Sequence, residues 1–185
     1  MPAKISAHHP LRQLFEALVE STFTREVGLH DMRVPRYIAN LLVDFTHRDN
    51  LFRIRDARGR PIEEVAEMLA DGDVALSATS FEREREVHKH IGDFTLFWTG
   101  VYPEMLRYFR AAARKDHLID YVEQGRSSYR IAATFDYGPY AQEAPILRRL
   151  ADEFERCIFG LNRVRSEMDA LGDPQLRAVR RLLED

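Results

Sequence analysis

The sequence has few of the features that mark a secreted or membrane-bound chain. Cys157 is the single cysteine among 185 residues, so an intramolecular disulfide is excluded, and its helical context predicts a small buried apolar side chain. The longest apolar stretch, residues 94 to 102, is interrupted by two threonines and one glycine and is far shorter than a membrane-spanning segment. These absences favour a chain that works in a reducing, aqueous compartment.

The sequence also lacks an excess of charge of either sign. Its 27 Lys and Arg residues against 30 Asp and Glu residues give a formal net charge of −3, which supplies no electrostatic reason to bind nucleic acid. Residues 1 to 20 contain one lysine and two histidines but no apolar core of a signal peptide. We therefore expect a cytoplasmic protein that has neither nucleic acid nor a membrane as its partner.

Strand-like alternation is nearly absent, and apolar residues recur at helical spacing along most of the chain. Prolines at first turns, and glycine or aspartate at the breaks, separate these periodic segments. No internal repeat or linker divides the chain. The sequence predicts an all-α bundle of seven or eight helices in a single domain, residues 1–185. The predicted helices cover residues 10 to 28, 35 to 45, 61 to 70, 81 to 99, 103 to 114, 116 to 135, 150 to 168 and a short terminal segment after 173.

The predicted helix over residues 81 to 99 changes character halfway along its length. Its first half is strongly charged and its second half is apolar nearly all round, which is typical of a helix end surrounded by other helices. Asp93 enters where the apolar half begins, and an ionised carboxylate there would be costly without partners. Lys89 or His90, one turn earlier, could supply one. Asp93 is predicted to be a hydrogen-bonded structural hub, with a catalytic or ligand-binding acid as the alternative.

The predicted helix over residues 116 to 135 has a face of mixed character as well. Small residues on it, such as Gly125, would let another helix approach closely or would leave space beside a ligand. We expect any internal polar pocket to lie between this helix and the one over residues 81 to 99. The candidate pocket residues are His88, Asp93, Thr95 and Tyr129.

Carboxylate and histidine pairs at helical spacing raise the question of a metal site. Glu84 and His88 are four residues apart and would project from one helix face. Di-iron bundles need Glu-x-x-His twice, with further glutamates from other helices, and no Glu-x-x-His occurs in this sequence. Solvated ion pairs on a charged face are the simpler interpretation, so no metal site is favoured, and Glu84 and His88 are kept as the candidates.

Two segments resemble a known group of proteins. Residues 92 to 104 read G-D-F-T-L-F-W-T-G-V-Y-P-E, and residues 121 to 129 read Y-V-E-Q-G-R-S-S-Y. The first is similar to a G-D-x-x-L-F-x-x-G-x-x-P-E segment in a family of uncharacterised bacterial all-helical proteins of about this size. The resemblance implies a helical fold and carries no activity, cofactor or ligand with it.

Two hypotheses of function from different classes remain open. No nucleophile triad, phosphate-binding glycine loop, dinucleotide fingerprint or zinc-knuckle spacing is present in the sequence. The first hypothesis is a helical binding or self-assembly module without catalytic machinery. The second is a metal- or small-ligand-binding bundle, built like haem-oxygenase-like or ferritin-like folds and acting as an oxidoreductase, which is a fold-level analogy. The sequence names no cofactor and no ligand for either.

Self-association is the last expectation. Apolar residues from Leu150 to Met168 alternate four and three residues apart, which is the spacing of a packed helix, and Ile158 and Phe159 widen that surface. We expect this apolar surface to exceed what one domain of this size covers, so we predict a homodimer through helices. The alternative is that this segment is the central strut of a monomer.

Overall fold

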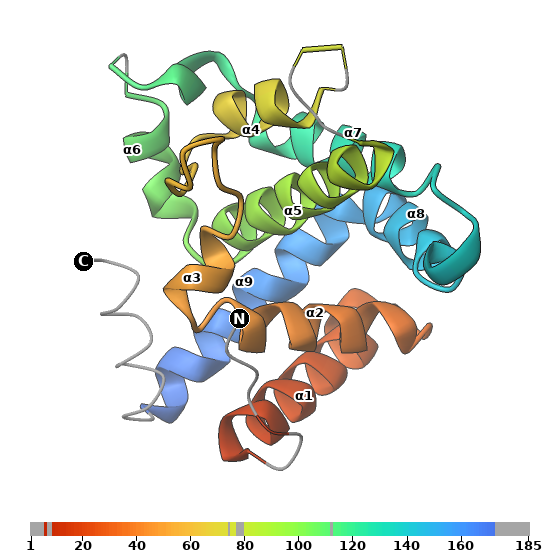
Figure 1. Cartoon of the computed structure of the whole chain (residues 1–185). Helices are drawn as coiled ribbons and strands as arrows, with labels where there is room; N and C mark the ends of the chain where they lie inside the picture. Colours follow the sequence, from red (N-terminus) through yellow and green to blue (C-terminus); the bar gives the residue numbers. More distant parts are fainter. Residues whose placement is uncertain (1–5, 7–8, 74, 77–79, 112, 173–185) are drawn as a thin grey trace.

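The computed structural model describes residues 6, 9–73, 75–76, 80–111 and 113–172, and these form an all-helical fold (Figure 1). Within these ranges the only β-type pairing is an isolated bridge between Arg55 and Pro61. The predicted fold class is therefore confirmed. The nine α-helices of the described ranges are α1 Pro10–Thr22, α2 Arg33–Asp44, α3 Arg48–Leu51, α4 Val65–Gly72, α5 Phe81–Gly100, α6 Leu106–Phe109, α7 Tyr121–Ala132, α8 Ala144–Asp152 and α9 Phe154–Leu171.

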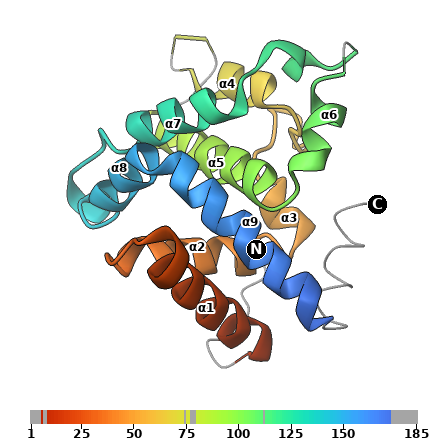
Figure 2. The same cartoon turned by 180° about the vertical axis from the view of Figure 1, so that it is seen from behind.

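Helix α5 is the axis of the fold. Ser80 caps its first turn by accepting a hydrogen bond from Arg83 N at 3.2 Å, and acidic residues in that turn suit the positive end of the helix dipole. Every residue from His90 to Gly100 is buried. In Figure 1 α4 lies on one side of α5 and α2 on the other, and in Figure 2, the view from behind, α9 runs diagonally across the near side of the molecule between α5 and α1.

Helices α5 and α7 approach each other closely because each has a glycine at the contact. A Cβ atom on Gly92 would lie 2.5 Å from the Tyr129 ring, and one on Gly125 would overlap the Thr95 hydroxyl and the Phe154 ring. Real Cβ atoms do not tolerate such distances. The small residues of the α7 face therefore serve helix packing, which is one of the two uses that the sequence left open.

Asp116 has a different role from the one that its position suggests. The sequence predicts a helix from about residue 116 with this aspartate as its N-cap, but α7 begins at Tyr121 and is capped by Asp120, which accepts from Val122 N at 2.9 Å. The fully buried Asp116 carboxylate instead accepts from Val65 N at 2.9 Å and Ala66 N at 2.8 Å. It satisfies the first amides of α4, some fifty positions away in sequence, so local pattern could not reveal it.

Other helix boundaries also differ from the predicted ones. The segment predicted to be helical from residue 61 begins with Pro61 in the bridge to Arg55, and α4 starts only at Val65. The predicted helix over 103 to 114 is broken into a 3₁₀ turn, the four-residue α6 and a further turn. The single helix predicted over residues 150 to 168 is interrupted at Glu153, which separates α8 from α9. The terminal helix predicted after residue 173 lies outside the described residues.

The apolar line that motivated the homodimer is covered within one chain. Leu150, Phe154, Cys157, Leu161 and Val164 are each 0–1% exposed and belong to the common core. Their burial agrees with the spacing of a packed helix in this part of the sequence. The segment is therefore a strut of the monomer's own core, and the homodimer stays a prediction. No described helix combines the length and the hydropathy that crossing a membrane requires.

The α5–α7 contact leads to a stability prediction. Gly125→Ala should lower the free energy of unfolding by about 1–3 kcal/mol, because the added methyl group has no space beside Thr95 and Phe154. Urea denaturation followed by circular dichroism measures this. Ser127→Ala, at an exposed position two residues along α7, is the control and should change little. An unchanged Gly125→Ala midpoint would contradict the close contact.

Candidate functional site

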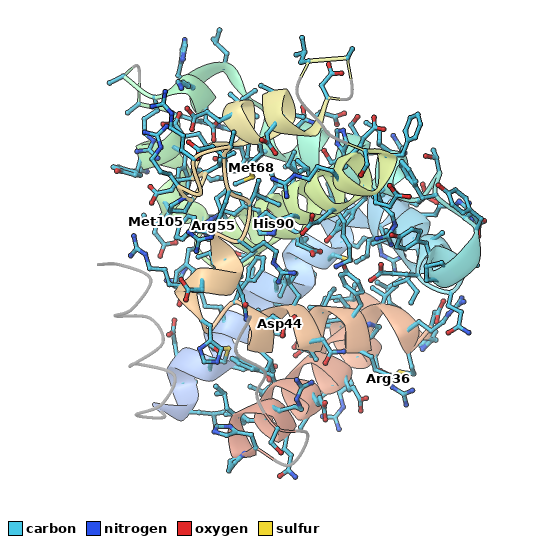
Figure 3. All side chains as sticks on the ribbon, in the orientation of Figure 1. Arg36, Asp44, Arg55, Met68, His90 and Met105 are labelled. Carbon is cyan, nitrogen blue, oxygen red and sulfur yellow. The ribbon has the colours of Figure 1, made fainter. Side chains whose placement is uncertain are left out.

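The candidate site is a pocket of about 420 Å³ beside the first three turns of α5. Its walls come from α5, from the segment that follows α3 and from the 3₁₀ turn Gly138–Tyr140. His90 projects from α5 near the middle of the molecule (Figure 3). The lining residues are mostly charged: Arg53, Ser80, Glu82, Arg83, Arg85, Glu86, Lys89, His90, Asp93 and Tyr140.

Asp93 joins three side chains from three helices. Its Oδ1 accepts hydrogen bonds from Tyr37 Oη of α2 at 2.7 Å and from Tyr129 Oη of α7 at 2.8 Å. Its Oδ2 accepts from Lys89 Nζ, one turn back on α5, at 3.3 Å. Burial, together with the nearby Asp93 charge, raises the pKa of both tyrosines well above its usual value, so both phenols stay protonated donors. The predicted structural hub is thus present, and Lys89 is the partner from the preceding turn.

A second layer of charged groups extends from Lys89 towards the pocket wall. Glu143 accepts from Arg85 Nη2 at 2.5 Å and lies 3.7 Å from Lys89 Nζ. The Arg85 guanidinium, 6% exposed, stacks 3.9 Å above the centre of the Tyr140 ring. A buried arginine held by a carboxylate and an aromatic face is rigid. This wall is therefore ordered before any ligand enters.

The two remaining arginines of the pocket differ in their partners. Arg83 is held by Asp71 at 2.6 Å and Glu86 at 3.2 Å. Arg53 donates from Nε to the Asn50 carbonyl at 3.1 Å, and no carboxylate of the described residues forms an ion pair with it. Its positive charge acts on the neighbouring His90 ring instead. Arg53 is thus the pocket cation that is not neutralised by a described acidic side chain.

His90 is the unusual member of the site. It is 2% exposed, and its ring packs between Phe45 and Phe94, at centroid distances of 5.8 Å and 6.0 Å. Neither ring nitrogen has a hydrogen-bond partner of normal geometry among the described residues. Burial, reinforced by the Arg53 charge, lowers the pKa of His90 to about 3, although Asp93 and the backbone of Leu51 act in the opposite direction. The imidazole is therefore neutral at physiological pH.

The structure divides the four predicted pocket residues between two regions. Asp93 and Tyr129 are brought together, and Asp93 lines the pocket. His88 contacts Ser128 Oγ at 3.3 Å in the α5–α7 interface, and Thr95 donates to the Ile91 carbonyl at 2.7 Å. The expected location between these two helices is closely packed. The pocket found here is bordered by no residue of α7.

Sequence reasoning missed most of the pocket lining. His90 was considered as a partner for Asp93, but Arg53, Arg85 and Tyr140 carried no signal that separates them from solvated surface residues. Their roles depend on contacts between distant segments, such as the Arg85 stack on Tyr140. The sequence feature that did indicate this part of α5 is the polar Asp93 at the start of the apolar half of the helix.

Other chemistry has little basis in the described residues. No group of three or more His, Cys, Asp or Glu side chains within them is placed to hold a metal ion. Glu84 and His88 share a face of α5 without a third described ligand. Cys157 is fully buried, and burial raises the pKa of its thiol to about 12, so the thiolate that acts as a nucleophile is disfavoured.

Comparison of the chain with protein-family models, with curated proteins and with solved structures gives no match. The resemblance of residues 92 to 104 to a bacterial helical family therefore stays a prediction. Functional inference rests on the geometry of the site.

The hub predicts a measurable loss of stability. Asp93→Ala should lower the free energy of unfolding by about 1–3 kcal/mol, because Tyr37 and Tyr129 would each keep a buried hydroxyl without its acceptor. Tyr37→Phe should cost less, since Tyr129 and Lys89 still pair with the carboxylate. Asp152→Ala, on the exposed side of α8, is the control. Equal midpoints for Asp93→Ala and the control in urea denaturation would refute the hub.

His90 predicts a pH dependence of stability. Its pKa is about 3 in the fold against 6.5 in the unfolded chain, so below pH 6.5 the unfolded chain binds a proton that the folded chain does not. The free energy of unfolding should then fall by about 1.4 kcal/mol per pH unit as the pH drops from 6.5 towards 3. In His90→Phe this contribution should vanish, while exposed His30→Gln should keep it. Parallel profiles for wild type and His90→Phe would contradict a neutral buried imidazole.

Proposed function

We propose that this chain is a binding protein for a small polar molecule, which occupies the pocket beside α5. The observation that carries the proposal is the buried His90, which lines a pocket of about 420 Å³ and whose two ring nitrogens have no hydrogen bond of normal geometry among the described residues. Pockets for small molecules typically have volumes of about 300–1,000 Å³ and are largely preformed. This pocket lies within that range, and its mostly charged lining suits a polar ligand rather than an apolar one.

An unpaired buried imidazole has a cost that the fold alone does not explain. A buried polar group without a hydrogen bond destabilises a protein by about 1–3 kcal/mol. The neighbours of His90 are Phe45 and Phe94, and a phenylalanine would pack between them without that cost. A ligand that hydrogen-bonds to the ring would remove the penalty, which is the pattern expected when stability is exchanged for binding.

Binding is favoured over catalysis because the reactive groups of the pocket are already engaged. Lys89 is held by ion pairs with Asp93 and Glu143. Ser80, the serine of the pocket, caps α5. Among the described lining residues this leaves hydrogen-bonding and charged groups in fixed positions, and no nucleophile paired with a base. The binding-module hypothesis fits this arrangement.

The second hypothesis from the sequence is a bundle that binds a metal or a small ligand. The pocket supports the small ligand, whereas the described residues contain no set of side chains placed to hold a metal ion.

A cytoplasmic location and a homodimer also belong to this proposal. The location rests on composition alone, and the homodimer rests on exposed apolar side chains such as Phe159, which is 51% exposed on α9.

The proposal is tested with two series of small probes that differ in charge but little in shape. The series are benzoate, benzamide and benzylammonium, and butyrate, butyramide and butylammonium. Titrations followed by amide NMR should show saturable shifts of Arg85, Lys89 and His90 with at least one probe. The same shifts should be absent in His90→Phe, which should itself unfold at higher urea because the unpaired ring is gone.

Two results would overturn the binding function. One is a complete lack of shifts in the pocket amides with all six probes. The other is undiminished binding by His90→Phe, which would mean that the unpaired imidazole has no part in binding. A matched control is His30→Gln, at an exposed position, which should bind like the wild type.

A further inference from the structure

We infer that the ligand of this pocket is a small carboxylate, bound between Arg53 and His90 together with one proton that His90 holds. This inference rests on the proposed binding function and names the chemical class of its ligand. It depends on the two pocket groups that the rest of the structure leaves without partners of the right kind. These are a cation without a described carboxylate and an imidazole without a hydrogen bond.

Arg53 supplies the charge that an anion would meet. Its Nε is fixed on the Asn50 carbonyl at 3.1 Å, which holds the planar guanidinium at the pocket while its terminal nitrogens have no described carboxylate. A guanidinium binds a carboxylate with two parallel hydrogen bonds. Arg53 and His90 line the same pocket. A carboxylate on Arg53 would therefore lie in the cavity that His90 also borders.

The other cations of the pocket argue for a single negative charge on the ligand. Arg83, Arg85 and Lys89 are each paired with acidic side chains. These acidic groups, among them Glu143 and Asp93, surround the site with negative charge. A doubly charged phosphate would meet more of that repulsion than a carboxylate would. The pocket thus suits a monoanionic head group.

A proton accompanies the anion because the site is buried. Adding a carboxylate and a proton together brings no net charge into the pocket, whereas adding the anion alone incurs the full cost of charge burial. His90 is the group assigned that proton, since it borders the pocket and neither of its buried ring nitrogens has a hydrogen bond of normal geometry among the described residues. A charged imidazole next to a carboxylate is stabilised as an ion pair.

The groups that face His90 decide whether this protonation can occur without the ligand. Arg53, from the segment after α3, and Lys89, on α5, both oppose a positive charge on the ring, whereas Asp93 favours it. The Asp93 oxygens are already engaged by Tyr37, Tyr129 and Lys89. Phe45, directly after α2, and Leu51 of α3 contribute no charged side chain, although the Leu51 backbone also favours a positive charge on the ring. The imidazole therefore stays neutral until an anion offsets Arg53.

The experiment measures the affinity of benzoate and of benzamide at about pH 7.5 and about pH 5.5, which bracket the ordinary pKa of histidine. Benzoate should bind more tightly than benzamide, and its affinity should rise by up to about tenfold per pH unit on acidification, as uptake of one proton requires. Calorimetry in buffers of different ionisation enthalpy should report uptake of close to one proton.

Variants assign these effects to the two residues. Arg53→Gln should weaken benzoate at least about tenfold, while Arg58→Gln, an exposed arginine in the next turn of the chain, should not. His90→Phe should lose the pH dependence of whatever benzoate binding remains. Circular dichroism and urea midpoints confirm that each variant is folded.

Several outcomes would overturn the inference while leaving the binding function intact. Equal affinity for benzamide and benzoate would exclude recognition of the negative charge. Tighter binding of inorganic phosphate than of benzoate or butyrate would exclude a monoanionic carboxylate as the preferred ligand. Affinity that does not change with pH would exclude the proton on His90. Failure of every neutral and charged probe to bind would instead count against the proposed function itself.

Discussion

The arrangement of the molecule depends on the hydrogen bonds that satisfy one buried carboxylate. Asp93 is 4% exposed, and a charge at that depth is tolerated only when its oxygens are fully bonded. Its three donors come from α2, α5 and α7, so satisfying the charge fixes these helices relative to one another. Lys89 continues the network to Glu143, and Glu143 holds Arg85. One satisfied charge in the core thereby orders a wall of the pocket some distance along α5.

His90 and Asp93 are three residues apart on the same helix, and the fold treats them in opposite ways. Asp93 has three donors, whereas neither nitrogen of the His90 ring, which packs between Phe45 and Phe94, has a hydrogen bond of normal geometry among the described residues. Lys89, which lies one turn before Asp93, pairs with that carboxylate and with Glu143. The polar groups of this part of α5 thus satisfy Asp93 and leave the imidazole of the pocket-lining His90 unsatisfied.

The sequence predicts those features that local pattern determines. The all-helical fold, the extent of α5 and the burial of Leu150, Phe154 and Leu161 follow from the spacing of apolar residues. Asp93 could be singled out because a carboxylate inside an apolar helix is conspicuous. Asp116 and Arg53 could not be placed, because an acidic residue before a helix and an arginine in a loop look alike whether their partners are local or distant. Asp116 accepts hydrogen bonds from the first amides of α4, and Arg53 has no ion pair with a described carboxylate. Both facts depend on tertiary contacts alone.

The position of the pocket follows from the packing of α5. On the side that faces α7, Gly92 and Gly125 bring the two backbones so close that a single added carbon would overlap a neighbouring side chain. A polar face built that tightly can bind another helix but leaves no space for a ligand, even though His88, Thr95 and Tyr129 all lie there. On the side that faces the segment after α3, the described residues place long charged side chains of α5 beside Arg53 and Tyr140, and a cavity remains between them. In this fold the small residues of α5 and α7 serve close packing, and the pocket lies on the neighbouring face of α5, where the side chains are large.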